Sequence, residues 1–497
     1  MTHDPDRELV PAGTGLRPDA GSRLLAGGTV LAGGSPVRVL RLTPSGARQV
    51  AGWWSGTPVP DSTRARALAR RLLDTGIAHP APDGCGWSID DVTVVIPVRD
   101  RQAELARCLA GLAQMPRVIV VDDASRDPAA VARVAAGAGA RVLHRVVNGG
   151  PGAARNCGLA AADTPLVAFL DSDCVPGPGW LDALLPHFAD PAVGAVAPRI
   201  VPDAPGRTWL ARYEGASSTL DMGTRESIVR PGSRVPYVPG AALVVRRSAA
   251  GAGFTETMRV GEDVDFVWRL AASGWRVRYE PAATMPHQHR VRLRPWFARR
   301  KDYGTSAAIL EQRHPGTVRP LYISAWTALA WLAAAAGRPA AGAACTGASI
   351  ALLARRLALV TGEEWPWQAA GTAWPLAARL AGGGTAAAGR PLGSAISRTW
   401  WPVALPAAVA VRRMRWPLTA LILAPPLLDW LDRRPPLDPA RYVAARLLDD
   451  IGYSLGVWQG CGERRTIRPL LPRLGSRHLD MPRENSAGTM TSSGDRS

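Results

Sequence analysis

Residues 165–174 read Pro165-Leu166-Val167-Ala168-Phe169-Leu170-Asp171-Ser172-Asp173-Cys174. The first six form an uncharged apolar run, which predicts a buried strand, and two aspartates follow where this strand ends. Because side chains alternate along a strand, the two carboxylates can converge on one divalent cation once the strand gives way to a loop. An isolated Asp-x-Asp is more often a solvated turn, so the sequence between Ile89 and Leu270 decides between these interpretations.

The sequence around this motif alternates between apolar strands and helical patterns. Strands are predicted at residues 92–98, 118–121, 142–146, 166–170 and 193–197. Apolar strands separated by helices are typical of an α/β fold, in which a parallel sheet carries helices on both faces. Ligands of such sheets bind at the carboxyl ends of the strands. Asp100, Asp122 and Asp171 each stand at that edge, which is therefore acidic in a basic protein.

A glycine-rich segment, Gly149-Gly150-Pro151-Gly152, follows the third predicted strand and opens a helix. Glycines let the backbone approach a ligand closely, and a helix N-terminus favours anions. Arg155 lies one turn into this helix, where it can reach a phosphate or a pyrimidine. The segment lacks the Gly-Lys-Ser/Thr ending of a P-loop, and it does not follow the first strand as dinucleotide-binding glycines do. An NTPase and a dehydrogenase are therefore both disfavoured.

Two acidic pairs have a functional and a purely structural interpretation. Asp122 and Asp123 end the second strand, where a carboxylate can accept hydrogen bonds from a base or a ribose; one of the two is expected to be a helix cap instead. Glu262 and Asp263 are expected in the turn before a helix, where a carboxylate can act as a general base, whereas Asp265 is interpreted as a partner of the helix dipole.

Two histidines follow this acidic helix. His287 and His289 lie some twenty residues further along the chain, and a histidine after an acidic pair can complete a metal site with Asp171 and Asp173.

The composition of the chain limits the kinds of partner that it is expected to bind. The chain has 497 residues, which predicts two or three domains, and a net charge of +18, which predicts an anionic partner. Arginines cluster at residues 290–300, just before the most apolar third of the chain. No nucleic-acid reader module with stacking aromatic residues is evident, so a membrane surface is favoured and nucleic acid is not.

Cysteine usage and the first residues of the chain indicate the compartment. The six cysteines lie far apart without a Cys-x-x-Cys pair, which disfavours a disulfide framework or a zinc site and fits a reducing cytosol. The first residues lack a secretion signal, so the catalytic region is expected in the cytoplasm.

The chain divides into five predicted segments. Residues 1–15 are expected to be disordered, 16–87 to form a small α+β module, 89–310 the catalytic domain, 320–475 an apolar helical region and 476–497 a disordered tail. Within the helical region, residues 320–337 are long enough for a weak membrane span, and residues 339–354 are marginal. The runs 399–411 and 416–428 are short and contain prolines, so they are expected to be re-entrant, interfacial or buried; a soluble helical bundle is the alternative for the whole region.

The motifs of residues 89–310 resemble, in order and spacing, those of family 2 glycosyltransferases with the GT-A fold. The matching residues are Val95-Ile96-Pro97-Val98-Arg99-Asp100, Val121-Asp122-Asp123-Ala124-Ser125, Gly149-Gly150-Pro151, Ala154-Arg155-Asn156, Leu170-Asp171-Ser172-Asp173, Pro239-Gly240-Ala241-Ala242 and Gly261-Glu262-Asp263. The resemblance implies a mixed, mainly parallel sheet with helices on both faces and an inverting, metal-dependent transfer from a nucleotide sugar. The Gln-x-x-Arg-Trp motif of the polymerising members is absent, which disfavours processive synthesis.

The resemblance also implies roles for individual residues. Those implied to bind the UDP-sugar are Pro97, Arg99, Asp122, Asp123, Arg155 and Asp171. Mg²⁺ or Mn²⁺ would be held by Asp171, Asp173 and His287, with His289 as the alternative to His287. Asp263, with Glu262 beside it, would be the base that deprotonates the acceptor hydroxyl.

The flanking segments also resemble known modules. Residues 16–82 resemble winged-helix-like peptide-recognition modules of ribosomal-peptide pathways, and residues 444–472 resemble the tail of mycofactocin-system glycosyltransferases. Together they imply transfer of glucose from UDP-glucose, with a β linkage, to a peptide-derived redox cofactor at the cytoplasmic face of the cell membrane. A membrane glycosyltransferase acting on a lipid or cell-wall polysaccharide and an inactive peptide-binding scaffold are the alternatives.

Overall fold

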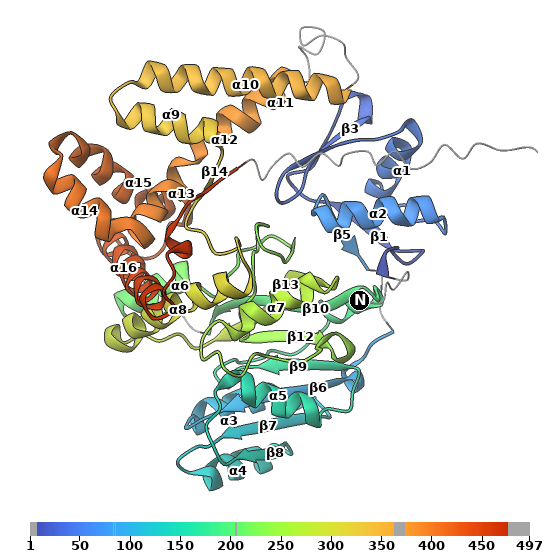
Figure 1. Cartoon of the computed structure of the whole chain (residues 1–497). Helices are drawn as coiled ribbons and strands as arrows, with labels where there is room; N and C mark the ends of the chain where they lie inside the picture. The colour runs from blue at the N-terminus through green and yellow to red at the C-terminus, as the bar shows by residue number, and fades with distance from the viewer. Residues whose placement is uncertain (1–6, 83, 85, 204–205, 362–372, 476–497) are drawn as a thin grey trace, which may run out of the picture.

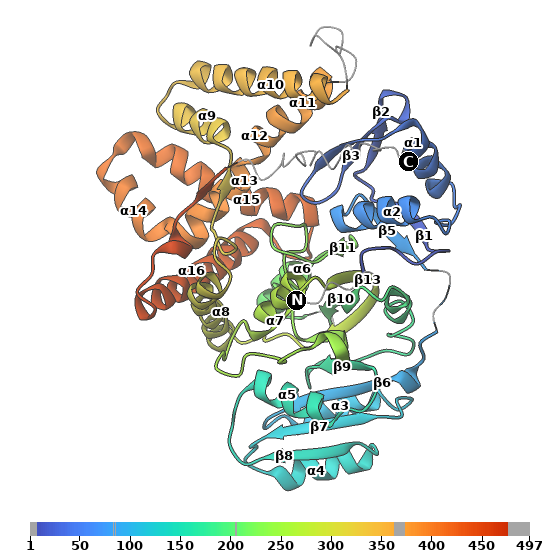
Figure 2. The same cartoon turned by 45° about the vertical axis from the view of Figure 1, so that its right-hand side comes forward.

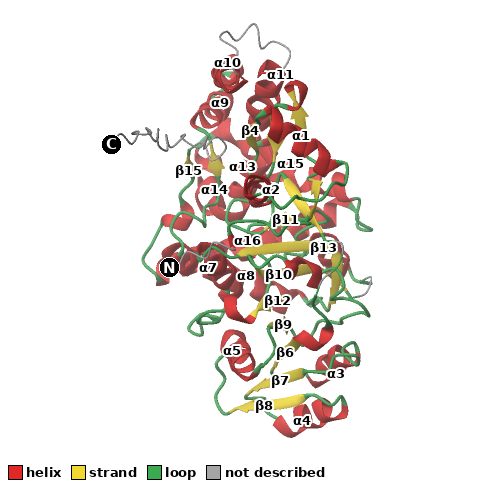
Figure 3. Ribbon diagram, turned by 90° about the vertical axis from the view of Figure 1, so that its right-hand side faces the viewer, coloured by secondary structure: helices red, strands yellow, loops and turns green. Residues whose placement is uncertain are grey.

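The computed structural model describes residues 7–82, 84, 86–203, 206–361 and 373–475 (Figure 1). Cys85, the first six residues and the predicted C-terminal tail from residue 476 lie outside the described residues. The described chain is built around an eight-stranded sheet in the order β11-β13-β10-β12-β9-β6-β7-β8. Figure 3 shows these strands stacked in this order below the N-terminal module.

The sheet is mixed. Its strands are β6 (Val92–Val98), β7 (Val118–Asp123), β8 (Arg141–Arg145), β9 (Leu166–Leu170), β10 (Val193–Pro202), β11 (Ser227–Ile228), β12 (Ala242–Arg246) and β13 (Arg276–His287). The pairs β6–β7, β6–β9, β7–β8 and β10–β13 are parallel. The pairs β10–β12, β12–β9 and β11–β13 are antiparallel. The predicted mainly parallel sheet is therefore confirmed, with an antiparallel strand β12 inserted beside β9.

Helices cover both faces, as the apolar strands predict. Val94 and Ile96 of β6 point into a core shared with α3 (Gln102–Ala110) and α4 (Pro128–Gly137), whereas Val95 points into a second core. This second core is closed by α5 (Pro151–Ala161) and α7 (Glu262–Ala272). Figure 3 shows α5 and α3 on opposite sides of the sheet.

Strand β8 is shorter at its end than the sequence predicts. It ends at Arg145, and Val146 and Val147 are exposed by 97% and 73%. Strand β8 is the edge of the sheet, so no neighbouring strand lies beyond it to extend the ladder, and the chain turns instead into the glycine-rich segment.

The N-terminal module has its own core. Its elements are β1 (Gly15–Pro18), β2 (Arg23–Leu25), β3 (Val30–Gly33), β4 (Arg38–Arg41), α1 (Pro44–Trp54), α2 (Thr63–Thr75) and β5 (Ala78–Ala81). Thr43 caps α1 through the amide of Gly46, and Gly76 ends α2 with a φ of 68°, where a residue without Cβ is favoured. Val10 is fully buried in the same core as Trp53, so this module begins before residue 16.

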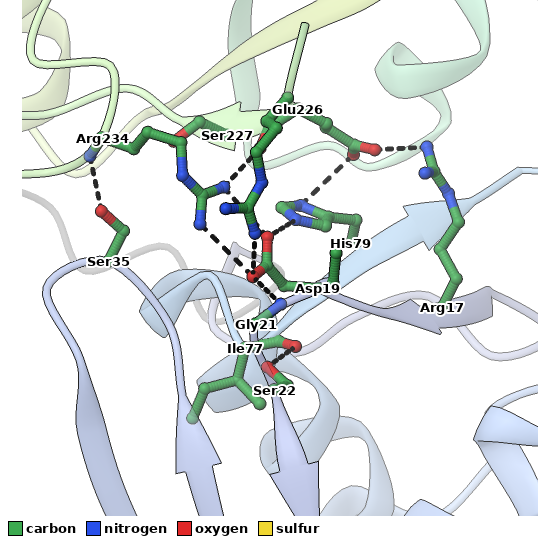
Figure 4. A network of polar contacts seen from close by, with 12 residues as sticks. Arg17, Asp19, Gly21, Ser22, Ser35, Ile77, His79, Glu226, Ser227 and Arg234 are labelled. Atoms are coloured by element: carbon green, nitrogen blue, oxygen red, sulfur yellow. Dashed lines mark hydrogen bonds and ion pairs between the residues drawn. The ribbon is translucent and has the colours of Figure 1, made fainter. Parts of the chain in front are cut away.

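A buried polar network joins the module to the catalytic domain (Figure 4). Asp19, 4% exposed, accepts hydrogen bonds from His79 of the same module at 3.1 Å and from Arg234 of the catalytic domain at 2.9 Å. Burial alone would raise the pKa of Asp19, but these bonds outweigh burial and hold its pKa well below the usual range. Arg278 of β13 donates to His79 at 3.1 Å and to Glu226 at 2.7 Å. The module is therefore fixed to the sheet by paired charges.

The C-terminal region is helical. Its main helices are α9 (Ala325–Ala335), α10 (Pro339–Thr361), α11 (Ala373–Ala377), α12 (Gly383–Ala387), α13 (Gly389–Ala395), α14 (Trp401–Ala410), α15 (Arg415–Arg433) and α16 (Pro439–Glu463). Residues 320–337, predicted as the better membrane span, contain β14 (Tyr322–Ile323) and the short α9 instead. Among the described residues, one helical stretch, Pro339–Leu359 of α10, is long and apolar enough to cross a membrane, and 22% of it is buried within the protein.

Helix α16 packs closely against α8 (Leu293–Arg313) of the catalytic domain. A Cβ atom on Gly456 would lie 1.9 Å from the carbonyl oxygen of Lys301, and one on Gly304 would lie 2.1 Å from that of Tyr453. Small residues on both helices therefore let the two backbones touch.

We expect Gly456→Ala to force α8 and α16 apart and to lower the free energy of unfolding by about 2 kcal/mol. Gly462→Ala is the matched control on the same helix, because a Cβ atom on Gly462 would meet nothing within 4 Å and alanine favours a helix. Urea unfolding of both variants tests this. Equal stability of the two variants would show that the helix contact is not tight.

Candidate active site

The predicted edge of the sheet gathers the acidic residues. Asp100 follows β6 with a φ of 54°; its carboxylate accepts the amide of Arg126 at 2.7 Å, and its own amide donates to Ser125 at 3.0 Å. The loops after β6 and β7 are thus tied together. Arg99 is exposed in the first of these loops, and Pro97 lies in β6 itself.

Arg155 is the centre of the site. Its guanidinium, 3% exposed, donates to Asp171 at 2.7 Å, to Glu262 at 2.8 Å and to the carbonyl of Gly240 at 3.2 Å. Gly150, with a φ of 87°, starts the helix that carries it. Burial alone would lower the pKa of Arg155, but the charges of Asp171, Glu262 and Asp263 raise it. The arginine was predicted to bind nucleotide; in this structure its donors hold three protein segments together.

Glu262 and Asp263 lie in the first turn of α7, not in the turn before it as predicted. Glu262 is 5% exposed and is Arg155's partner; burial and the charge of Asp263 raise its pKa. Asp263 is partly exposed and accepts the amides of Gly240 and Val264, each at 2.8 Å. Of this pair, Asp263 is the more exposed residue.

Gly240 lies close to both Asp263 and Arg155. A Cβ atom there would lie 3.0 Å from Cβ of Asp263 and 3.1 Å from Nη2 of Arg155. The Pro-Gly-Ala segment before β12 therefore sets the distance between the arginine and the acidic helix start.

The two aspartates of the Asp-x-Asp motif have different partners. Asp171, with its side chain 33% exposed, turns to Arg155, whereas Asp173 pairs with Arg101 and with Nε2 of His287 at 3.2 Å. Burial alone would raise the pKa of Asp173, but the bond from His287 and the charges of His287 and Arg101 hold it well below its usual range. Burial alone would lower the pKa of His287, and Asp173 raises it.

The predicted metal ligands come together in part. Among the described residues, no group of three or more His, Cys, Asp or Glu side chains is arranged to hold a metal ion. Asp173 and His287 are in contact, and Nδ1 of His287 is buried without a hydrogen-bond partner. His289 lies with its ring 5.3 Å from that of His287, and burial lowers its pKa to about 4. Nε2 of His289 is likewise buried without a partner, so it is the contact with Asp173 that favours His287 over His289 as a metal ligand.

Asp122 and Asp123 hold the neighbouring loops. Asp122 accepts the amide of Ser125 at 3.0 Å and contacts His144 at 3.1 Å, so it stabilises a turn. The helix cap expected of one of the pair is instead Asp127, which caps α4 through the amide of Ala130. Asp123 accepts the amides of Gly149 and Gly150 at 2.9 and 2.7 Å and pairs with Arg145. Asp123 thereby fixes the glycine-rich segment at the edge of the site.

Comparison with known proteins identifies the fold. The model of glycosyl transferase family 2 matches residues 93–254. The chain is 43% identical to the pre-mycofactocin glycosyltransferase of Mycobacterium tuberculosis over 477 residues. This match covers 94% of this chain and 98% of that protein.

The chain belongs to glycosyltransferase family 2. It is an enzyme of this family, and its sheet with helices on both faces is the GT-A fold. A succinoglycan biosynthesis protein of Rhizobium meliloti is 31% identical over 203 residues, which is 38% of this chain and 59% of that protein. Among solved structures, a mannosyltransferase of Pyrobaculum calidifontis aligns with a TM-score of 0.34 and 20% identity, over 59% of this chain and 84% of that one.

Several residues of this family 2 glycosyltransferase site were not predicted from the sequence. Arg101 follows Asp100 directly and could have been suspected from the loop it shares. Arg145 is in register with Asp123 across the parallel pair β7–β8, which only the strand pairing reveals.

The C-terminal helices also reach the glycosyltransferase site. Burial raises the pKa of Tyr237 to about 12, and the groups that act on it are Tyr453, Arg398, Asp263 and Tyr303. Tyr453 lies on α16, with the guanidinium of Arg398 4.0 Å above its ring. Tyr303 of α8 and Tyr453 of the C-terminal region therefore both lie near Tyr237.

We expect two of the acidic residues of α7, Asp263 and Asp265, to differ in how much they contribute to the stability of the protein. Asp265, fully buried, binds Thr255, Arg269, Arg313 and His314. Burial alone would raise its pKa, but bonds from His314, Arg313 and Thr255 hold it well below the usual range. Asp265→Asn should cost about 2–3 kcal/mol of unfolding free energy at neutral pH, since Arg269, Arg313 and His314 lose the buried charge that pairs with them. Asp263→Asn should change it by less than about 0.5 kcal/mol.

The sign with pH follows from the lowered pKa. A carboxyl group with a depressed folded pKa contributes stability above its unfolded value, near 3.8 for aspartate, and loses it as the pH falls further. The stability difference between wild type and Asp265→Asn should therefore shrink in acid. Urea titrations at neutral and acidic pH measure it, and a larger loss for Asp263→Asn would reverse the two assignments.

Proposed function

We propose that this glycosyltransferase moves glucose from UDP-glucose onto a peptide-derived redox cofactor of the mycofactocin kind, with inversion and a divalent metal. The observation that carries the proposal is Asp263, a partly exposed carboxylate held by two backbone amides beside the buried Arg155 cluster. The identity to the pre-mycofactocin glycosyltransferase supports the acceptor, because it extends over both flanking regions as well as the catalytic domain.

Asp263 supplies the base. A carboxylate in reach of the acceptor hydroxyl takes its proton as the oxygen attacks the anomeric carbon. Asp171 and Glu262 are both bonded to Arg155, which leaves Asp263 as the carboxylate of the α7 start available to substrate. One base acting on one attacking hydroxyl gives a single displacement, so an α-linked donor would yield a β-glucoside.

The donor side is assigned to the residues at the strand ends. Asp123 and the amides it holds at Gly149 and Gly150, with Asp122, Arg99 and Pro97, are proposed to surround the nucleotide. Asp173 and His287, with Asp171 when it turns from Arg155, would hold Mg²⁺ or Mn²⁺. When bound, such an ion neutralises charge on the leaving diphosphate.

The flanking regions are proposed to serve the acceptor. The N-terminal module would recognise the peptide-derived part, and a cavity of about 190 Å³ lies between this module and the catalytic domain, lined by Thr14, Arg70, Ile228 and Arg276. This cavity is separate from Asp171 and Asp263. The catalytic domain is proposed to work in the cytoplasm, at the membrane surface.

We expect Asp263→Asn to lower the rate of hexose transfer by about 10²–10⁴-fold, the usual contribution of general base catalysis. Purified protein is incubated with UDP-glucose, Mn²⁺ and a pre-mycofactocin extract, and hexose additions are counted by mass spectrometry. Asp173→Ala should raise the Mn²⁺ concentration needed for half-maximal rate. Asp163→Asn, an exposed aspartate in the loop before β9, is the matched control.

Three outcomes would contradict the proposal. Unchanged transfer by Asp263→Asn would show that Asp263 is not the general base. Transfer to a lipid or polysaccharide acceptor but not to the peptide-derived one would replace the acceptor, and absence of any transfer would favour a peptide-binding scaffold.

A further inference from the structure

Helix α14 is apolar on every side and yet has no buried residue. Its sequence, Trp401 to Ala410, contains only Trp, Pro, Val, Ala and Leu. Val403, Leu405 and Val409 are exposed by 59%, 59% and 67%. A helix that is apolar all round is normally buried in a core or in a membrane, so we expect another surface to pack against α14.

The turn after α14 continues the apolar surface and adds charge. Val411 and Met414 are exposed by 45% and 39%, and Trp416 at the start of α15 is exposed by 83%. Arg412, Arg413 and Arg415 stand between them, all exposed. We call residues 401–416 the α14–α15 tip. Figures 1 and 2 both place α14 at the outer edge of the helical region, away from the sheet.

No acidic residue neutralises the tip from within its own part of the chain. Residues 365–428 contain no Asp or Glu, and the first carboxylate after the tip is Asp429. Asp429 pairs with Arg433 at 2.8 Å and accepts a hydrogen bond from Tyr442, so its carboxylate is already paired with groups outside the tip. The tip therefore presents positive charge together with an apolar helix.

We propose that the α14–α15 tip inserts into the surface of an anionic phospholipid bilayer and anchors the enzyme there without crossing it. This rests on the proposed work of the catalytic domain at a membrane surface, and it names the site of contact. Apolar side chains enter the acyl boundary, Trp416 takes the position that indoles favour, and Arg412 and Arg413 meet lipid phosphates.

The geometry limits the tip to the interface. Ten helical residues span roughly 15 Å, half of a hydrocarbon core. Arg415 donates to the carbonyls of Ala408 and Val409, each at 3.1 Å, so the open end of α14 keeps its hydrogen bonds on leaving water. Helix α10, the longer apolar helix, is held differently: Ala354, Leu357 and Ala358 pack against α11 and against Val39 of the N-terminal module.

A second copy of the chain fits the α14–α15 tip less well than a bilayer does. A two-fold dimer through the tip would bring each arginine cluster toward its own copy, in a protein of net charge +18. A bilayer containing phosphatidylglycerol offers apolar depth and negative charge at once.

The test is sedimentation of the full-length protein with vesicles of phosphatidylglycerol and phosphatidylcholine in equal parts, against phosphatidylcholine alone. Wild type should bind the mixed vesicles, less at high salt. Arg412→Gln/Arg413→Gln should lower partitioning about thirtyfold, since each basic side chain near such a surface contributes about 1 kcal/mol, or roughly fivefold. Val409→Ser/Trp416→Ser should lower it on both vesicle types. Val146→Ser, an exposed valine at the far sheet edge, is the matched control and should bind as wild type does.

Other outcomes would overturn the tip's role. Wild type that ignores anionic vesicles, or variants that bind as well as wild type, would contradict it. A dimer that dissociates on Val409→Ser/Trp416→Ser would show that a second copy covers the tip. Hexose transfer by Arg412→Gln/Arg413→Gln to a soluble acceptor should equal that of wild type, so a failure of anchoring is distinguishable from a failure of the proposed reaction.

Discussion

The buried ion cluster around Arg155 is the constraint on which the site depends. A guanidinium taken out of water must be paired, because an uncompensated buried charge costs several kcal/mol. Here one carboxylate comes from the end of β9 and the other from the start of α7, with a carbonyl from the segment before β12. One side chain thus fixes three segments that are far apart in sequence, and Asp263 is held in place by the same segment through Gly240. The positions of Asp171, Glu262 and Asp263 relative to one another therefore depend on Arg155.

Much of this arrangement could be predicted from the sequence because apolar strands and glycine turns are local signals. Strands β6 and β9 begin and end where the apolar runs do. Strand β13 was not predicted, because Arg276, Arg278 and Glu280 make it look like a solvated segment. These side chains are paired with Asp74, Glu226 and His187 from other elements, and such partners are invisible in a linear sequence.

The roles of paired acidic residues were the least predictable. Glu262 and Asp263 are adjacent in sequence, but helical geometry sends one side chain into the Arg155 cluster and leaves the other partly exposed. Asp265 looked like a dipole partner and is instead fully buried among Arg269, Arg313 and His314. Likewise, the division of Asp171 and Asp173 between an arginine and a histidine depends on α5 and β13, which the motif itself does not contain.

The flanking regions belong to the same architecture. Paired charges join the N-terminal module to β13, and glycines let α16 lie against α8, so both flanks bear on the catalytic domain. Tyr303 lies on α8 and Tyr453 on α16, so each helix of this packed pair places a tyrosine near Tyr237.

We infer that Arg155 organises the proposed donor and acceptor sides together. This role is tested most directly by calorimetric titration of UDP, in the presence of Mn²⁺, into wild type and Arg155→Lys, with hexose transfer measured on the same samples. A lysine cannot bond two carboxylates through a planar fork, so UDP affinity and transfer rate should fall together, each by about 100-fold, while circular dichroism shows a folded protein. Wild-type affinity and wild-type transfer in a folded Arg155→Lys variant would contradict the account.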